Sequence, residues 1–350
     1  MIIIGGNDMK CALIKGVKEF EVKEIDEPKS TNGSVLMDIK KCGICGSDIH
    51  NWVAGQPEGL VMGHEFCGIV TDPGSRNDLK VGDRVTALPL SPCAHCEACY
   101  TGNIQYCPET WTYATGLAVT NPGGLAPKIS VRPDMVIKVP DNLKDEEVAM
   151  TEPMAVGLHA VNLANIKIGS KVLVVGGGII GLASALLAKR AGASYVVISE
   201  TNKERGQKSV DLNVADSWVD ATNSEEVNKL INRFNGFDVV IECCGNEPAV
   251  TSAIMAVKPG GTVVLVGVAT KPIAVPMVVA VMREITVQGA IAYTKKEFEI
   301  CIDLMARGQI DVMKFVSDIV GLNGVQKAYE RLTSGTDSAI KILVDPNKMD

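Results

Sequence analysis

The sequence has no excess of positive charge. It carries 34 lysines and arginines against 41 aspartates and glutamates, which gives a formal net charge of −7 at pH 7. Nucleic acids and anionic membrane surfaces are usually bound by surfaces rich in basic side chains. We therefore expect no nucleic-acid partner and no membrane partner for this chain.

The sequence also lacks a hydrophobic run of the length that crosses a membrane. The apolar run at residues 172–188 has seventeen residues, four of them glycines, whereas a membrane helix needs about twenty mostly apolar residues. It predicts instead a buried strand, a turn and a helix. The N-terminal segment MIIIGGNDMK has no basic residues ahead of its apolar stretch, which argues against a signal peptide. Met9 resembles a second start, so residues 1–8 are interpreted as a dispensable extension of a cytoplasmic protein.

Internal repeats and low-complexity linkers are absent, and 350 residues are long for a single core, which favours two domains. Up to about residue 140, short segments broken by Gly, Pro and Asp predict the strands of a barrel or sandwich. Those strands are expected at residues 35–41, 68–71, 83–88 and 135–139.

The pattern changes after Glu146, where strands alternate with helices. This alternation predicts a doubly wound parallel sheet. Its strands are expected at residues 171–175, 195–199, 237–242, 262–266 and 286–288. From about residue 295 the chain returns to mixed structure, and it ends in a strand at residues 339–344.

A glycine-rich turn, GGGIIG, follows the predicted strand at residues 171–175 and leads into an apolar helical stretch. Its glycines permit a tight turn and a close approach to a pyrophosphate, which the helix N-terminus attracts. The next strand ends on Glu200, nineteen residues past Gly181, where a carboxylate would hold the ribose 2′-hydroxyl and repel a 2′-phosphate. The pattern predicts NAD rather than NADP as cofactor. The cofactor-binding candidates in the turn are Gly176, Gly178, Ile180 and Gly181.

Eleven cysteines in a chain interpreted as cytoplasmic favour metal or redox chemistry over disulfides. Four of them are closely spaced: Cys93, Cys96, Cys99 and Cys107. Four thiolates suit a tetrahedral zinc ion and leave no position open, which is typical of a structural site. An iron–sulfur cluster is the weaker alternative, because the ferredoxin run has three residues before its fourth cysteine and this chain has seven. His95 lies in the same loop, but four cysteines already complete the site, so we expect its side chain to be exposed.

A second group of potential ligands is spread along the chain. CGSDIH at residues 45–50 precedes GHE at 63–65, and TEP follows at 151–153. One thiolate, one imidazole and carboxylates could hold zinc with a position free for substrate, as a catalytic zinc requires. The histidine could equally be a core residue and the glutamate after it a surface charge. Cys42 and Cys45 form a competing CxxC pair, which is typical of thiol redox chemistry, and spacing leaves these alternatives open.

These motifs together resemble the medium-chain zinc-dependent alcohol dehydrogenases, in the branch of the sorbitol, threonine and butanediol dehydrogenases. The resemblance extends over the chain from Met9. It rests on GICGSDIH at 43–50, GHE at 63–65, VGDRV at 81–85, the four-cysteine segment, TEP at 151–153, GGGIIG at 176–181, ECCG at 242–245 and KPGGTVVLVG at 258–267. It implies an α/β protein that forms a homotetramer. A GroES-like β-barrel catalytic domain would cover residues 1–155 and 292–350, and a Rossmann NAD-binding domain residues 156–291.

The resemblance also implies roles for single residues. Cys45 and His64 match catalytic zinc ligands, and Glu65 and Glu152 match positions near the metal, of which one coordinates. Asp48 matches the carboxylate that orients the zinc histidine, and Ser47 and His50 match a proton relay. Further matches are Arg205 beside the adenosine, Val266, Val268 and Ile291 along the cofactor, and Trp52, Trp111 and Thr112 in the substrate pocket.

The implied reaction is the oxidation of a secondary alcohol (a diol, a polyol or a related compound) or its reverse, with zinc at the hydroxyl and a hydride passing to the nicotinamide. The chain departs from the polyol dehydrogenases at Ala292-Tyr293, where they tend to carry Arg-Tyr. Without that guanidinium a bidentate donor for polar substrates is missing, which argues against a sugar alcohol. A zinc-less quinone or enoyl reductase and a non-catalytic nucleotide-binding sensor are the alternatives. The intact zinc ligands argue against the first, and the Ser47–His50 pair argues against the second.

Overall fold

The computed structural model describes residues 8–350, which form two compact units. The first unit contains residues 8–152 and Thr294–Asp350, and the second contains Pro153–Tyr293. The unit boundaries fall after residues 152 and 293, against predicted boundaries after 155 and 291. Apart from Asp8, the predicted N-terminal extension lies outside the described residues. Among residues 8–350 no helix has both the length and the apolar character needed to cross a membrane.

The first unit is built on a mixed sheet of seven strands in the order β14-β15-β3-β4-β5-β7, with β6 paired to β3. Its strands are β3 (Val35–Gly43), β4 (Glu65–Asp72), β5 (Arg84–Ala87), β6 (Lys128–Val131), β7 (Val136–Lys138), β14 (Val316–Val320) and β15 (Lys341–Val344). A hairpin of β1 (Asp8–Gly16) and β2 (Glu19–Asp26) forms a separate sheet. Because β15 pairs with β3, the C-terminal end of the chain completes the sheet that the N-terminal half begins.

The helices of this unit are short and lie between the strands in sequence. They are α1 (Gly46–Ala54), α2 (Glu97–Tyr100), α3 (Asp145–Ala149), α10 (Lys295–Ala306) and α11 (Val325–Thr333), with 3-10 turns at Ile104–Tyr106, Pro133–Met135, Met313–Phe315 and Leu322–Gly324. Helix α4 (Thr151–Ala164) begins in the first unit and continues into the second.

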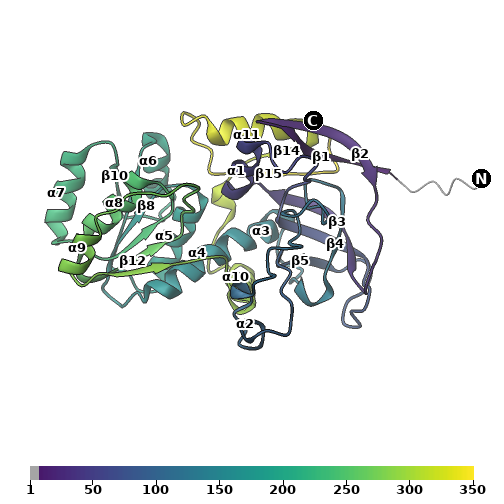
Figure 1. Ribbon diagram of the computed structural model, residues 1–350, viewed down its shortest axis with the longest axis horizontal. Coiled ribbons are helices and arrows are strands. Elements are labelled where there is room, and N and C mark those ends of the chain that lie inside the picture. The colour runs from purple at the N-terminus through teal and green to yellow at the C-terminus, as the bar shows by residue number, and fades with distance from the viewer. Residues whose placement is uncertain (1–7) are drawn as a thin grey trace, which may run out of the picture. The chain divides into compact units, whose positions relative to one another are not determined.

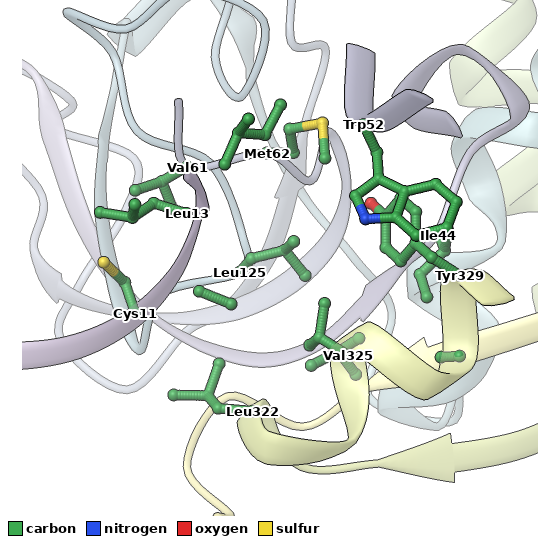
Figure 2. Packing of buried hydrophobic residues seen from close by; sticks show 14 of the residues in the cluster. Cys11, Leu13, Ile44, Trp52, Val61, Met62, Leu125, Leu322, Val325 and Tyr329 are labelled. Carbon is green, nitrogen blue, oxygen red and sulfur yellow. The ribbon is translucent and has the colours of Figure 1, made fainter. Parts of the chain in front are cut away.

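A hydrophobic cluster ties α1 to the N-terminal hairpin and to α11 (Figure 2). The Trp52 ring of α1 lies 5.6 Å from the Tyr329 ring of α11, centroid to centroid, and the Phe20 ring of β2 lies 4.7 Å from Tyr329 on another side. Aromatic pairs at such distances add about 0.5–1.5 kcal/mol to the gain from burial alone. The C-terminal helix therefore holds in place the helix that carries the motif at residues 45–50.

The second unit contains a sheet of six parallel strands in the order β10-β9-β8-β11-β12-β13. Figure 1 shows this unit with helices α5 to α9 around the sheet. They are β8 (Lys171–Val175), β9 (Tyr195–Glu200), β10 (Ser217–Asp220), β11 (Phe237–Glu242), β12 (Val257–Leu265) and β13 (Thr286–Gly289). The helices are α5 (Ile179–Arg190), α6 (Lys203–Asp211), α7 (Ser224–Phe234), α8 (Glu247–Ala256) and α9 (Met277–Met282). Numbered along this unit the order is 3-2-1-4-5-6, the order of Rossmann folds that bind dinucleotides. The predicted doubly wound sheet is confirmed.

Candidate functional site

The first candidate site begins where β3 ends and α1 starts. Cys45 is the last residue before α1, and its backbone N–H donates to the Asp48 carboxylate at 3.2 Å. The buried residues of α1 are Asp48 and Trp52, which are four apart and so share one face of the helix. Ser47 and His50 are exposed. The motif thus sends its carboxylate inward and its hydroxyl and imidazole outward.

Asp48 meets the histidine of the second motif. Its Oδ1 lies 3.3 Å from Nδ1 of His64, and both side chains are almost fully buried. A metal ion that displaces the proton from Nε2 would leave the proton on Nδ1 beside this carboxylate, the usual arrangement of a histidine that binds a metal. Burial lowers the pKa of His64, but the charges of Asp48 and Cys45 outweigh it and raise that pKa well above its usual value.

Glu65 follows His64 and is held by a residue that the sequence did not single out. Lys341 of β15 is completely buried, and its Nζ donates to both Glu65 carboxylate oxygens at 2.8 and 2.6 Å. Its third proton goes to the Ile44 carbonyl at 2.7 Å, so all three donors of the ammonium are used. A lone lysine in the otherwise apolar strand segment at residues 339–344 was the signal that could have revealed it.

Three possible ligands come together at this place. The ligand atoms of Cys45, His64 and Glu65 lie within 4.8 Å of one another. Glu152, in the first turn of α4, is nearly buried but is not a member of this group. Sulfur, nitrogen and carboxylate donors match the set that zinc takes in open catalytic sites, so the residues fit the metal.

The predicted relay and pocket residues take different positions around the motif. The Ser47 hydroxyl lies 3.5 Å from Nε2 of His64. Trp52 is only 2 % exposed and belongs to the hydrophobic cluster, where it packs on Tyr329 (Figure 2). Trp111 is 43 % exposed, and Thr112 beside it is exposed too. A substrate contact by these residues stays a prediction.

The four-cysteine segment folds into a compact lobe. The sulfur atoms of Cys93, Cys96, Cys99 and Cys107 lie within 4.8 Å of one another. Helix α2 begins directly after Cys96, which places Cys99 in its single turn, 3.6 Å from the Cys96 sulfur. Such a cluster of four thiols in one short loop fits a tetrahedral zinc with no open position.

The thiols of the lobe differ in acidity. Burial opposes ionisation of Cys107, but N–H groups of Cys93 and Glu109 outweigh it and lower the pKa of Cys107 to about 7. The Cys93 N–H lies 3.2 Å from that sulfur. Burial and the neighbouring thiol of Cys96 raise the pKa of Cys99 to about 11. Four thiolates at neutral pH therefore need a bound cation, as a zinc ion would provide.

The glycine-rich turn joins β8 to α5 as predicted. Gly176 has a φ of +104°, in the left-handed region that favours glycine. At Gly181 a side chain has no room, because a Cβ there would lie 1.9 Å from the Gly176 carbonyl oxygen. The turn follows β8, next to β11, where the strand order reverses, and in such sheets ligands bind outside the carboxyl ends of the strands at that point.

Glu200 is fastened to this turn. One carboxylate oxygen accepts from the Gly177 N–H at 2.7 Å and from Arg205 Nε at 3.0 Å, and the other accepts from Arg205 Nη2 at 2.8 Å. Burial raises the pKa of Glu200, but Arg205 and the backbone N–H groups outweigh it and lower that pKa. The carboxylate is thus ionised and fixed at the end of β9, where the sequence predicts the ribose contact.

Other predicted cofactor residues lie at the same end of the sheet. Val266 follows β12 and donates its N–H to the Glu242 carbonyl, while Val268 and Ile291 are 60 % and 44 % exposed. A further side chain at this end of the sheet, which the sequence did not single out, is that of Glu242. It is buried and accepts from the N–H groups of Cys244 and Gly245 at 2.6 and 2.8 Å. It fixes the turn after β11, and a single acid at the end of an apolar strand was its signal.

Known protein families match both units. The family profile described as alcohol dehydrogenase GroES-like domain matches residues 31–141, and the one described as zinc-binding dehydrogenase matches residues 180–307. A sorbitol dehydrogenase of Bacillus subtilis is 32 % identical over 360 residues, which cover 97 % of this chain and 98 % of the relative. A sorbitol dehydrogenase of Bombyx mori is 32 % identical over 345 residues, with 95 % and 97 % covered.

Solved structures of dehydrogenases are also similar to this chain. The 2R,3R-butanediol dehydrogenase of Bacillus subtilis is 31 % identical with a TM-score of 0.85, over 97 % of this chain and 100 % of that one. A Sinorhizobium meliloti protein described as a zinc-binding dehydrogenase and bound to NADP is 30 % identical with a TM-score of 0.87, with the same coverage. The similarity thus covers nearly the whole chain, including both units.

Proposed function

The chain belongs to the medium-chain zinc-dependent alcohol dehydrogenases, oxidoreductases that act on CH–OH groups with zinc and NAD or NADP, and on that premise we propose that it oxidises a secondary alcohol of the diol type. The observation that carries the proposal is the grouping of Cys45, His64 and Glu65 beside the orienting carboxylate of Asp48. Named relatives act on sorbitol and butanediol. Ala292 offers no guanidinium for a longer polyol, which favours the diol.

Different residues of the first unit would bind the metal, orient its histidine ligand and carry the substrate proton. Zinc bound by Cys45 and His64, with Glu65 or Glu152, would lower the pKa of a substrate hydroxyl. Asp48 lies 3.3 Å from Nδ1 of His64, and its charge favours a proton on that nitrogen. Ser47 and His50 are three apart on α1 and therefore neighbours on the helix surface. Both are exposed, so Ser47 can accept the hydroxyl proton while it passes its own proton towards His50, which releases a proton to solvent.

An initial-rate panel tests this function. Butanediol, sorbitol, xylitol and a simple secondary alcohol are each offered with NAD and with NADP, and cofactor reduction is followed by absorbance. We expect the highest kcat/KM with butanediol. Turnover of quinones or enoyl compounds without any alcohol oxidation would refute the proposal, as would a complete absence of turnover.

Cofactor choice should depend on Glu200. The same Arg205 guanidinium that could receive a 2′-phosphate is held by this carboxylate. The relative from Sinorhizobium meliloti is bound to NADP, so the cofactor of this chain needs a direct test. A buried carboxylate that faces a phosphate costs several kcal/mol, so NAD should exceed NADP in kcat/KM by on the order of a hundredfold. Glu200→Gln should narrow the ratio, mainly through weaker NAD binding, whereas Glu204→Gln, an exposed acid on α6, should leave it unchanged. Equal use of both cofactors by the unmodified enzyme would place the ribose contact elsewhere.

Metal analysis should find about two zinc ions per chain, one for each group of ligands. The ion at Cys45 should leave first on dialysis against a chelator, because an open site exchanges its ligands more easily than four thiolates. Elemental analysis during dialysis, with activity measured in parallel, follows both ions. Full activity with a single zinc would contradict the two-site assignment.

We infer that a homotetramer forms, with one of its contacts at the β13 edge of the parallel sheet. Helix α9 beside it exposes a row of apolar side chains: Met277 at 53 %, Val278 at 68 %, Val281 at 74 % and Met282 at 80 %. Strand β13 ends the strand order, so its outer backbone groups can pair with the same strand of a second copy across a twofold axis. Light scattering should give the mass of four chains, and Val281→Asp should reduce it. The mass of one chain for the unmodified protein would refute this contact.

A further inference from the structure

A second group of side chains that could hold a metal ion shares one cysteine with the four-cysteine lobe. Ligand atoms of Cys93, His95 and Glu109 lie within 4.8 Å of one another. His95 and Glu109 are exposed, whereas Cys93 is half-buried. Thiolate, imidazole and carboxylate are the three donor types that zinc uses in proteins. The set is therefore open to solvent on the side of His95 and Glu109.

The backbone of the lobe orients the His95 side chain so that one ring nitrogen can bind a metal ion. Ala94 has a φ of +66°, in the left-handed region, which costs an alanine about 1–2 kcal/mol. This turn brings the imidazole back over the preceding cysteine, with Nδ1 2.9 Å from the Cys93 carbonyl oxygen. When Nδ1 carries the proton and donates it to that carbonyl, Nε2 keeps the lone pair. Histidines that bind metals use the same arrangement.

Cys93 links the outer set to the inner one. Its sulfur lies 4.0 Å from that of Cys99, and its N–H contacts the sulfur of Cys107. A zinc ion held by four thiolates has no open position, so it can enter or leave only by exchanging ligands one at a time. A ligand that belongs to both sets allows such an exchange without releasing the ion.

We propose that Cys93, His95 and Glu109 form a zinc exchange site through which the four-cysteine site is loaded and emptied. An incoming Zn²⁺ binds first to these three side chains. It stays bound to Cys93 while the other three cysteines replace His95 and Glu109, and each thiol that binds releases its proton to solvent. This inference rests on the proposed zinc at the four cysteines, and it is independent of the substrate.

Isotope exchange in the zinc-loaded enzyme tests the proposal. The protein is mixed with an excess of an enriched zinc isotope, and the bound isotopes are followed by native mass spectrometry. The slow phase belongs to the four-cysteine site if it persists in Cys45→Ala. We expect His95→Ala and Glu109→Gln to slow this phase by about tenfold or more. Glu97→Gln, an exposed acid of the same lobe outside the set, should not change it. The final zinc content should stay the same in the His95, Glu109 and Glu97 variants, whereas Cys45→Ala holds only the zinc of the four cysteines.

Cobalt supplies a second readout. Zinc-depleted enzyme is loaded with Co²⁺ and its absorption spectrum is followed over time. A first spectrum with weak thiolate-to-cobalt absorption should appear before the strong absorption of cobalt bound by four thiolates. His95→Ala should lack the first spectrum. An unchanged slow phase in both variants would overturn the exchange site. Loss of one zinc in His95→Ala would overturn it too, because His95 would then be a permanent ligand. The absence of any bound zinc from Cys45→Ala would refute the four-cysteine site itself, and the exchange site with it.

Discussion

Cys45→Ala should abolish turnover and remove about one zinc ion per chain, while Cys42→Ala should leave both nearly unchanged. The two cysteines are three residues apart, but the structure separates them. Cys45 precedes α1 and lies with His64 and Glu65. Cys42 belongs to β3, is completely buried, and packs so closely on the chain that a Cβ on Gly63 or Gly124 would meet its sulfur at 2.6 or 2.7 Å.

The measurement is the zinc content and the kcat of both single variants. Burial raises the pKa of the Cys42 thiol, and the charges of Asp48 and Glu65 raise it further, so it is a poor nucleophile for disulfide exchange. A redox CxxC pair predicts something different, namely equal damage from both substitutions and inactivation by an oxidant that links the two sulfurs. An inactive Cys42→Ala beside an active Cys45→Ala would reverse the assignment.

Lys341→Met should lower the free energy of unfolding by about 3–5 kcal/mol, because it leaves the Glu65 carboxylate buried without its cation. Both side chains are completely buried, and Glu65 receives two hydrogen bonds from the ammonium group. The measurement is urea unfolding followed by circular dichroism. Lys15→Met, which breaks an exposed pair with Glu19, is the matched control and should have little effect.

The double variant Lys341→Met/Glu65→Gln separates charge from packing. If the lost stability comes from the unpaired carboxylate, a neutral glutamine should recover most of it. Zinc content should be measured beside stability, since a zinc ion near Glu65 would partly replace the lost cation. Unchanged stability of Lys341→Met would show that the Glu65 carboxylate is not held as a buried anion by this lysine.

Features that depend on neighbours in sequence could be predicted from the sequence. The four cysteines lie within one loop, so their spacing alone restricts them to one place, and the structure groups their sulfurs. The turn at residues 176–181 needs only a strand, its glycines and a helix. Strands β8 and β11 have the predicted bounds, because their apolar stretches, residues 172–175 and 239–241, are buried and are followed by a glycine or an acid.

Features that depend on contacts between distant parts of the chain could not be predicted from the sequence. The packing of Trp52 on Tyr329, a residue of the C-terminal helix α11, joins segments that lie far apart in the sequence, and the predicted substrate contact of Trp52 stays a prediction. Which face of α1 turns inward is decided by the elements that pack on it, and those come from both ends of the chain. The outer set at Cys93, His95 and Glu109 likewise depends on a left-handed residue that the sequence does not announce.

By itself the sequence determined the class of the protein: two units, a dinucleotide turn ending in a fixed acid, a four-cysteine lobe and a looser set of zinc ligands. Only the tertiary structure decided which carboxylate lies with Cys45 and His64, and what holds it there. Lys341 reaches Glu65 across 276 residues of chain. This buried ion pair forms because β15 pairs with β3 and β3 pairs with β4, which brings Lys341 beside Glu65. Strand pairing between such distant segments leaves no local pattern in a sequence.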